Sequence, residues 1–220
     1  MLRRRVLCGV LSMILASGSA IAQPAVELIA AAAAGDLATV NRLLGAGADV
    51  KARDASGRTA LLAATQGNHV EVARALIAAG SDVNAKDSIQ DSPYLLAGAR
   101  GRVEILRMTL AAGADLKSVN RFGGTALIPA AHYGHVEVVR VLLATTIDID
   151  HVNRLGWTAL LEAIILGDGG AAHTEIVRLL LKAGARVDIA DGQGVTPLAH
   201  ARQRGQAAIV RLLEEAGARR

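Results

Sequence analysis

A segment of eight residues recurs along the chain, mostly at intervals of 33 residues. The copies DASGRTAL, NRFGGTAL and NRLGWTAL begin at residues 54, 120 and 153, and a looser copy, DSIQDSPY, begins at residue 87. The last copy, DGQGVTPL, begins at residue 191, which is five residues later than an interval of 33 would place it. A repeat of this length predicts a solenoid of stacked units, each of which buries its apolar faces only against its neighbours.

Each unit carries turn and helix signals at fixed places. Asp or Asn followed by Gly is typical of a tight turn, and the next Thr or Ser predicts a helix N-cap. Pro93 and Pro197 stand at the first position of the helix that follows. The segment GHVE, which begins at Gly134, predicts the start of a second helix, and glycines such as Gly113 predict where these second helices end. Only 2% of residues are aromatic, which favours small, close-packed helices.

The recurring pattern D-x-x-G-x-T-P-L, followed by G-H-x-E-V-V and by G-A-D, resembles the ankyrin repeat. The resemblance covers nearly all of the chain after residue 23. It implies an all-α repeat solenoid in which each repeat has a helix-turn-helix and a β-hairpin-like turn. We expect about five repeats and an N-terminal capping helix pair. The expected units are a capping repeat at 23–53, repeats at 54–86, 87–119, 120–152 and 153–190, and a C-terminal capping repeat at 191–220.

The five extra residues, DGGAA at 168–172, fall between the two helices of repeat 153–190. A phosphate-binding loop would need a preceding strand, a G-x-G-x-x-G spacing or a following Lys-Ser/Thr, and the sequence has none of these. We therefore expect a protruding, mobile loop with no ligand of its own.

Three residues depart from the repeat pattern. Thr146 stands where the family has a helix-ending glycine, so we expect strain or a rearranged helix end there. Asn68 replaces a turn glycine, which is a mild change because Asn tolerates the left-handed conformation. Pro129 lies in the first turn of its helix and should be tolerated at some cost in stability.

Residues 1–22 have the pattern of a secretory signal peptide. Three arginines precede an apolar segment, Val6–Ala16, that is too short to span a bilayer, and Ala20–Ala22 fits a small-x-small cleavage site. An N-terminal membrane anchor is the alternative. Cleavage predicts a periplasmic or secreted protein with no membrane insertion and would lower the net charge from +4 to +1. It would also remove Cys8, the only cysteine, and with it any thiolate chemistry.

The sequence shows no set of residues that indicates an enzyme. His69, His135 and His173 fall on the framework position of the ankyrin pattern, which implies a structural role. His132 lies near His135, but a metal site would need further ligands and no cysteine is available. We therefore expect no catalytic residues, no bound metal and no cofactor.

The resemblance also implies which positions face a ligand, namely the variable residues of the hairpin-like turns and first helices. In this chain they hold seven basic residues, one acid and three of the four aromatic residues. A face of one charge sign favours an oppositely charged partner, and aromatic and arginine side chains are typical of binding hot spots. The partner-binding residues we predict are Phe122, Tyr133, Trp157, Arg100, Arg121, Arg154, Leu155, His132, Ile165 and Leu166.

Our leading hypothesis is therefore an exported protein–protein interaction module, monomeric, that binds a partner protein with an acidic surface on its concave face. A small-molecule or metal-dependent hydrolytic site in the groove near His132 is the alternative from the enzyme class. Nucleic-acid binding is a third hypothesis, and export and the nearly neutral charge after cleavage argue against it.

Overall fold

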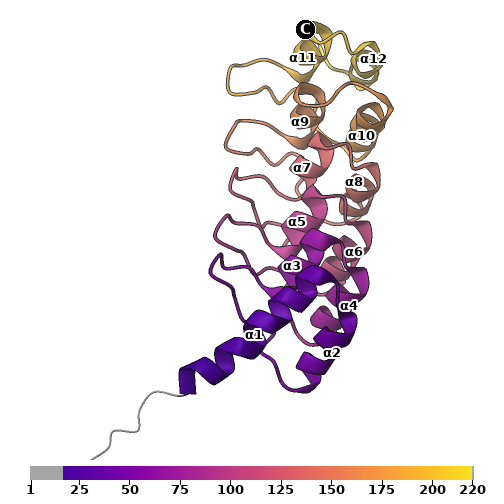
Figure 1. The fold of residues 1–220 in the computed structure, drawn as a ribbon. Helices are drawn as coiled ribbons and strands as arrows, with labels where there is room; N and C mark the ends of the chain where they lie inside the picture. The colour runs from indigo at the N-terminus through magenta and orange to yellow at the C-terminus, as the bar shows by residue number, and fades with distance from the viewer. Residues whose placement is uncertain (1–16, 220) are drawn as a thin grey trace, which may run out of the picture.

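The computed structural model describes residues 17–219, and this part of the chain contains twelve helices and no strands (Figure 1). The helices are arranged in six consecutive pairs along one stack, which confirms the predicted all-α ankyrin-type solenoid. In chain order the pairs are α1 (Ser17–Ala34) and α2 (Leu37–Gly45), α3 (Ala60–Gly67) and α4 (Val70–Ala78), α5 (Pro93–Ala99) and α6 (Val103–Ala111), α7 (Leu127–His132) and α8 (Val136–Leu143), α9 (Ala159–Ile165) and α10 (Ala171–Lys182), α11 (Pro197–Gln203) and α12 (Ala207–Glu215).

The first helices of the pairs form one column, the second helices form another, and the hairpin-like turns project from the first column (Figure 1). Each helix packs on its partner and on the equivalent helix of the neighbouring repeat. The core between the columns is rich in alanine, leucine, isoleucine and valine, and it runs without a break from Leu28 to Leu213. Small side chains let the short helices approach closely, as a stack of this kind requires.

Four of the first helices begin at the N-caps that the repeat pattern predicts. Thr59, Ser92, Thr158 and Thr196 each accept a hydrogen bond from the backbone N–H three residues later.

Repeat 120–152 starts its first helix differently because of Pro129. Pro129 has no N–H to donate to the carbonyl of Thr125, so Ile128 N bonds to that carbonyl instead, at 3.3 Å. Helix α7 then begins only at Leu127, and the hydroxyl of Thr125 is buried without a hydrogen-bond partner in the described chain. The proline is thus tolerated at the expense of an N-cap, as the sequence predicts.

Two polar residues adopt the left-handed backbone conformation where the pattern prefers glycine. Asn68 has φ of 58°, in agreement with its predicted role as a substitute for the turn glycine. Gln90 has φ of 67° at the place where the other hairpin-like turns have glycines with φ of 76–80°. Those glycines are Gly57, Gly123, Gly156 and Gly194.

The framework histidines tie neighbouring repeats together, as their position in the pattern implies. His69 Nε2 lies 3.0 Å from the carbonyl oxygen of Ala33, and His135 Nε2 lies 3.2 Å from that of Ala99. His173 Nε2 lies 2.8 Å from the carbonyl oxygen of His132 in the same way.

Two other side chains occupy the corresponding place in their repeats. In the last repeat, Gln206 donates from Nε2 to the carbonyl of Ile164 at 3.0 Å. Arg102 occupies the position in repeat 87–119, but its Nε is buried and has no hydrogen-bond partner within the described residues.

The helix end at Thr146 is rearranged, as predicted. Within the described chain, every other second helix is followed by a glycine with φ of 80–95°. Helix α8 ends instead at Leu143, and the hydroxyl of Thr145 donates to the carbonyl of Leu142 at 2.6 Å and accepts from Ile147 N at 3.2 Å. The hydrogen bonds of the Thr145 side chain thus form the helix end that a glycine in the left-handed conformation forms in the other units.

The inserted segment is not the protruding loop that we expected. Its last two residues, Ala171 and Ala172, form the first turn of α10, which is 12 residues long where the other second helices have 8 or 9. Asp168 accepts hydrogen bonds from Gly170 N and His173 Nδ1, both at 2.8 Å. The insertion therefore extends a helix at its N-terminus, and Asp168 holds the short turn that precedes it.

The predicted signal peptide falls mostly on residues 1–16, outside the described part of the chain. Its last six residues are the start of α1, which continues through the predicted cleavage site into the capping pair. None of the described helices combines the length and apolar character needed to cross a membrane.

Candidate functional site

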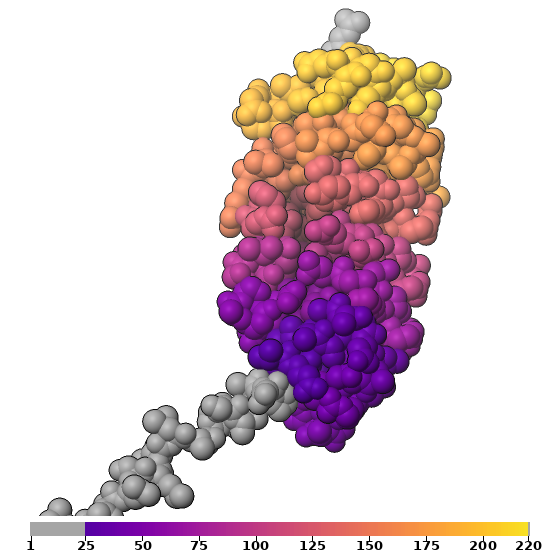
Figure 2. Space-filling model, viewed as in Figure 1, coloured from indigo at the N-terminus to yellow at the C-terminus, as the bar shows by residue number. Residues whose placement is uncertain are grey.

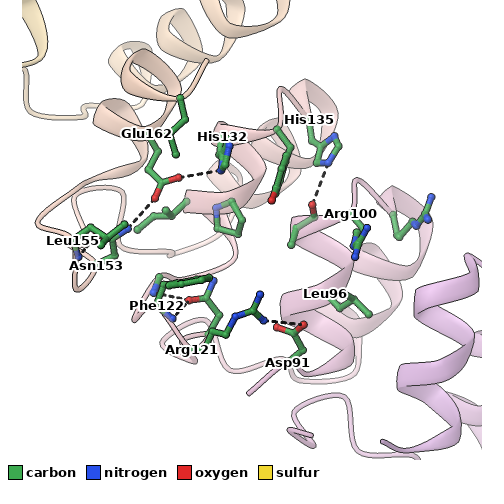
Figure 3. Close-up of a pocket in the computed structure, with 18 residues that line it drawn as sticks. Asp91, Leu96, Arg100, Arg121, Phe122, His132, His135, Asn153, Leu155 and Glu162 are labelled. Atoms are coloured by element: carbon green, nitrogen blue, oxygen red, sulfur yellow. Dashed lines mark hydrogen bonds and ion pairs between the residues drawn. The ribbon is translucent and has the colours of Figure 1, made fainter. Parts of the chain in front are cut away.

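A groove of about 760 Å³ opens between the hairpin-like turns and the first helices of repeats 87–119, 120–152 and 153–190 (Figure 3). Helices α5 and α7 supply one side of it, through side chains such as Leu96, Ile128 and Tyr133. The hairpin-like turns supply Phe122 and Leu155. The groove therefore lies across three consecutive repeats.

Seven of the ten predicted partner-binding residues line this groove, although they lie up to 66 positions apart in sequence. They are Arg100, Arg121, Phe122, His132, Tyr133, Leu155 and Leu166. Four of them expose large apolar or aromatic side chains: Phe122 is 51% exposed, Tyr133 59%, Leu155 51% and Leu166 43%. The structure thus gathers exposed apolar side chains around one hollow.

The other three predicted residues do not line the groove. Ile165 is buried at the end of α9. Trp157 is half-buried, and its Nε1 is enclosed without a hydrogen-bond partner among the described residues. Arg154 is exposed and donates from Nη1 to the carbonyl of Arg121 at 2.9 Å.

Several basic side chains of the predicted binding face connect one hairpin-like turn to the next. Arg53 donates to the carbonyl of Lys86 at 2.6 Å, and Lys86 Nζ donates to the carbonyl of Val119 at 2.7 Å. Arg154 makes the equivalent bond in the opposite direction along the chain. These charges therefore also stabilise the stack, whereas Arg100 and Arg121 lie at the groove itself.

Arg121 is held at the groove by two neighbours. Its guanidinium lies 4.8 Å from the centre of the Phe122 ring, within the range of a cation–π interaction. It also faces the carboxylate of Asp91 at 3.9 Å. Burial raises the pKa of Asp91, the nearby Asp87 raises it further, and the arginines Arg121 and Arg100 oppose this shift.

The groove also contains a buried carboxyl group that our sequence reasoning missed. Glu162, on α9, is 6% exposed. Its Oε1 accepts from Asn153 Nδ2 at 2.9 Å, and its Oε2 lies 3.5 Å from His132 Nδ1 (Figure 3). Burial raises the pKa of Glu162 to about 7, against the opposing effect of the Asn153 hydrogen bond.

A signal for Glu162 was present in the repeat register. It stands nine residues after the first residue of its unit, where the three preceding units have Ala63, Leu96 and Pro129. The last unit has His200 at this position, which bonds to Asp191 at 2.7 Å as Glu162 bonds to Asn153. A carboxyl group at a position that is apolar in the three preceding units is costly to bury unless it has a partner or a function.

His132 lies between this carboxyl group and the ring of Tyr133. Its ring stacks on Tyr133 with ring centres 4.2 Å apart and planes 12° apart. Burial lowers the pKa of His132, and the proximity of His173 lowers it further. Glu162, whose pKa is about 7, can therefore take up or release a proton near neutral pH, 3.5 Å from His132.

The described residues contain no group of three or more His, Cys, Asp or Glu side chains placed to hold a metal ion. Three arginines and two histidines line the groove, and its acids are Asp91 and Glu162. Because Asp91 faces Arg121 and Glu162 is partly protonated near neutrality, the lining is positively charged overall.

Comparison with known proteins agrees with this architecture. The family model for ankyrin repeats (three copies) matches residues 28–118 and 94–191. This chain belongs to the ankyrin-repeat family. Ankyrin repeats typically mediate protein–protein interactions, and the family is generally non-catalytic.

Bacterial ankyrin-repeat proteins are among its relatives. The crystal structure of an ankyrin repeat domain from Acinetobacter baumannii is 58% identical, with a TM-score of 0.85, and the match covers 87% of this chain and 98% of that one. The ankyrin repeat protein EF0377 is 42% identical, with a TM-score of 0.84 and the same coverage.

Two further relatives are more distant or shorter in overlap. The ankyrin repeat domain of Bcl-3 is 30% identical, with a TM-score of 0.78, over 88% of this chain and 86% of that one. The Escherichia coli ankyrin repeat protein YahD is 51% identical over 57 residues, which are 26% of this chain and only 28% of that protein.

Proposed function

We propose that this ankyrin-repeat protein is a binding module that holds a partner protein with an acidic surface in the groove of repeats 87–119, 120–152 and 153–190. One observation carries the proposal: four exposed apolar side chains surround a hollow whose rim carries arginines. Clustered apolar groups of this kind mark interaction sites on protein surfaces.

The two parts of the site have different physical roles. Burial of Phe122, Tyr133 and Leu155 against a partner would supply the free energy of binding, because it removes their exposed apolar area from water. Arg100 and Arg121 would guide an acidic partner toward the groove and orient it, an effect that weakens as salt rises.

Substitutions at the groove and on the opposite side of the stack test this proposal. Partners captured by crosslinking in the native compartment are compared for the wild type, Tyr133→Ala, Arg121→Glu and the control Arg107→Glu, which changes an exposed arginine on α6. We expect the two groove variants to lose a partner that the control keeps, and that purified partner to bind more weakly in high salt. Equal capture by all four proteins would refute the proposed site.

We also propose that the protein is exported to the periplasm, with secretion into the medium as the alternative. The support is the n-region, apolar segment and small-x-small site in residues 1–22. Cell fractionation combined with N-terminal sequencing of the mature protein tests this: an uncleaved chain in the cytosolic fraction would contradict it.

A small-molecule site in the same groove is the second candidate. It is favoured by the juxtaposition of Glu162 with His132, two groups that can transfer protons. A screen of generic ester and phosphate substrates on the wild type and on Glu162→Gln tests it. Turnover that the variant loses would support a hydrolytic activity.

A further inference from the structure

One part of the groove, which we call its floor, consists of Glu162 with its neighbours Asn153 and His132. The proposed protein-binding function does not by itself require a carboxyl group there. Glu162 is buried at a register position that is apolar in the three preceding repeats. Its Oε1 is occupied by Asn153, whereas its Oε2 has His132 Nδ1 only at 3.5 Å, which is long for a hydrogen bond. One oxygen of this carboxyl group thus faces the groove with only the long contact to His132 (Figure 3).

Arginines line the groove away from Glu162. Arg100 and Arg102 line the side of the groove nearer α5 and α6, and Arg121 lies on the hairpin-like turn (Figure 3). A cationic ligand group would meet these charges before it reached Glu162. An anionic group would be attracted by them, provided that Glu162 is protonated when it arrives.

We propose, building on the function above, that the floor of the groove binds a carboxylate side chain of the partner, with protonated Glu162 donating a hydrogen bond to it beside His132. The ligand is an aspartate or glutamate in an exposed segment of the partner, and its backbone neighbours contact Tyr133 and Phe122. A neutral carboxylic acid that donates to a carboxylate makes a short, charge-assisted hydrogen bond.

A monoanionic carboxylate fits this floor better than a phosphate does. Glu162 offers a single O–H, and Asp91 already offsets part of the charge of Arg121 at 3.9 Å. The remaining positive charge is modest, which favours a ligand group with one negative charge.

Proton uptake is the signature of such a site, so the other charged groups near it matter. The histidines on the helices packed against α9 are His132 on α7, His173 on α10 and His200 on α11. His173 faces Asp168, and His200 Nε2 lies 2.7 Å from Asp191 Oδ2.

The other charged residues of α10 and α11 are accounted for elsewhere. Glu175 pairs with Arg178, Arg202 pairs with Glu214, and Lys182 is exposed. The groove side chains Arg100, Arg102 and Arg121 stay charged across the neutral range. Glu162 is therefore the group whose protonation changes between pH 6.5 and pH 8 and which also faces the groove.

The expected pH dependence follows from the fraction of Glu162 that is protonated. With a pKa of about 7, that fraction falls about eightfold from pH 6.5 to pH 8, and the apparent affinity for a carboxylate falls by the same factor. Glu162→Gln keeps an N–H donor but cannot ionise, so it should bind at pH 8 about as tightly as the wild type binds at pH 6.5. Glu162→Leu lacks the donor and should bind weakly at both pH values.

The probes are fluorescein-labelled peptides, three of which compare Glu with Gln and Lys. They have the same ten-residue sequence of Tyr, Leu and Gly, except at three positions that hold Glu, Gln or Lys, and their binding is measured by fluorescence anisotropy at both pH values. We expect the Glu peptide to bind best, with the eightfold change in the wild type and a change below twofold in Glu162→Gln. A fourth peptide with phosphoserine at the three positions should bind no better than the Glu peptide.

Several outcomes would overturn the inference. They are preferential binding of the Lys or phosphoserine peptide, equal binding of the Glu and Gln peptides, no binding of the Glu peptide, or an unchanged pH profile in Glu162→Gln. If capture of the partner protein still depends on Tyr133 and Arg121, the proposed function is supported and only the carboxylate site is refuted. If capture does not depend on these residues, the proposed function and the carboxylate site are both refuted.

Discussion

The guanidinium of Arg154 donates from Nη1 to the backbone carbonyl of Arg121, 33 residues earlier in the chain, at 2.9 Å. Its aliphatic stem lies against Gly123, whose added Cβ would be 2.9 Å from Arg154 Cγ. A residue that the repeat pattern assigns to the binding face thus also connects two hairpin-like turns.

Arg154→Ala should therefore lower the free energy of unfolding by about 0.5–1 kcal/mol, because an exposed hydrogen bond and the packing of the stem are lost. Denaturation in urea measures this change. Arg107→Ala, on the second column of helices, is the matched control and should be neutral. Unchanged stability in Arg154→Ala would show that the bond to Arg121 contributes nothing to the fold.

His135→Ala should lower the free energy of unfolding by about 1–2 kcal/mol, because it removes the bond to the carbonyl of Ala99 and the contact with Gly101. The chain itself supplies the control, since Gln206 makes the equivalent bond through its amide. His135→Gln should therefore retain most of the stability in the same urea experiment. Equal losses in the two variants would mean that the hydrogen bond is not what stabilises this turn.

Gln90→Gly should stabilise the domain by about 0.5–1 kcal/mol. Gln90 has φ of 67°, a conformation that is unfavourable for a residue with a Cβ, and glycine occupies this place in the other hairpin-like turns. Thermal and urea unfolding check the gain. The reverse change at the matched position, Gly57→Ala, should destabilise, because its Cβ would also approach Ser88 N to 3.3 Å.

The pH dependence of stability should report on Glu162. Its pKa is about 7 in the folded domain and near its ordinary value of 4.5 when unfolded. The folded state thus binds more protons between these values, so the contribution of Glu162 to stability is fully present below pH 4.5 and is lost as the pH rises through about 7. The loss from this one group is about 3 kcal/mol.

Comparison with Glu162→Gln isolates this effect from the other titrating groups. The variant should be more stable than the wild type at pH 8 and should lose this part of the decrease in stability between pH 5 and pH 8. Free energies from urea denaturation at several pH values give both quantities. Parallel curves for the two proteins would mean that the pKa of Glu162 is not raised.

The 33-residue register is enough to predict the helix pairs, most N-caps and the role of the framework histidines, because these depend on residues within one unit or at one repeat distance. The extension of α10 was not predictable in this way, since it depends on whether Ala171 and Ala172 join the helix or stay in the inserted turn that Asp168 holds.

The candidate site shows the same limit. The pattern places Phe122 and Tyr133 on the ligand side, and they line the groove, but it cannot show that Trp157 is half-buried. The repeat pattern also did not predict that Glu162 is buried, because this burial depends on the packing of α7 against α9. Comparing the register positions of successive units would have pointed to it, together with His200 in the last unit.

In four repeats a side chain at the start of the second helix bonds to a backbone carbonyl of the preceding repeat, and these side chains are His69, His135, His173 and Gln206. Arg102 occupies this position in repeat 87–119, and its Nε has no hydrogen-bond partner among the described residues. The joint between repeats 54–86 and 87–119 is still bridged by Arg53, which donates to the carbonyl of Lys86, and by Ser88 N, which donates to the carbonyl of Ser56 at 2.9 Å. Every residue that lines the groove comes after this joint, from Asp91 onward. Because each unit packs only against its neighbours, we expect substitutions in the first two units, away from this joint, to leave the shape of the groove unchanged.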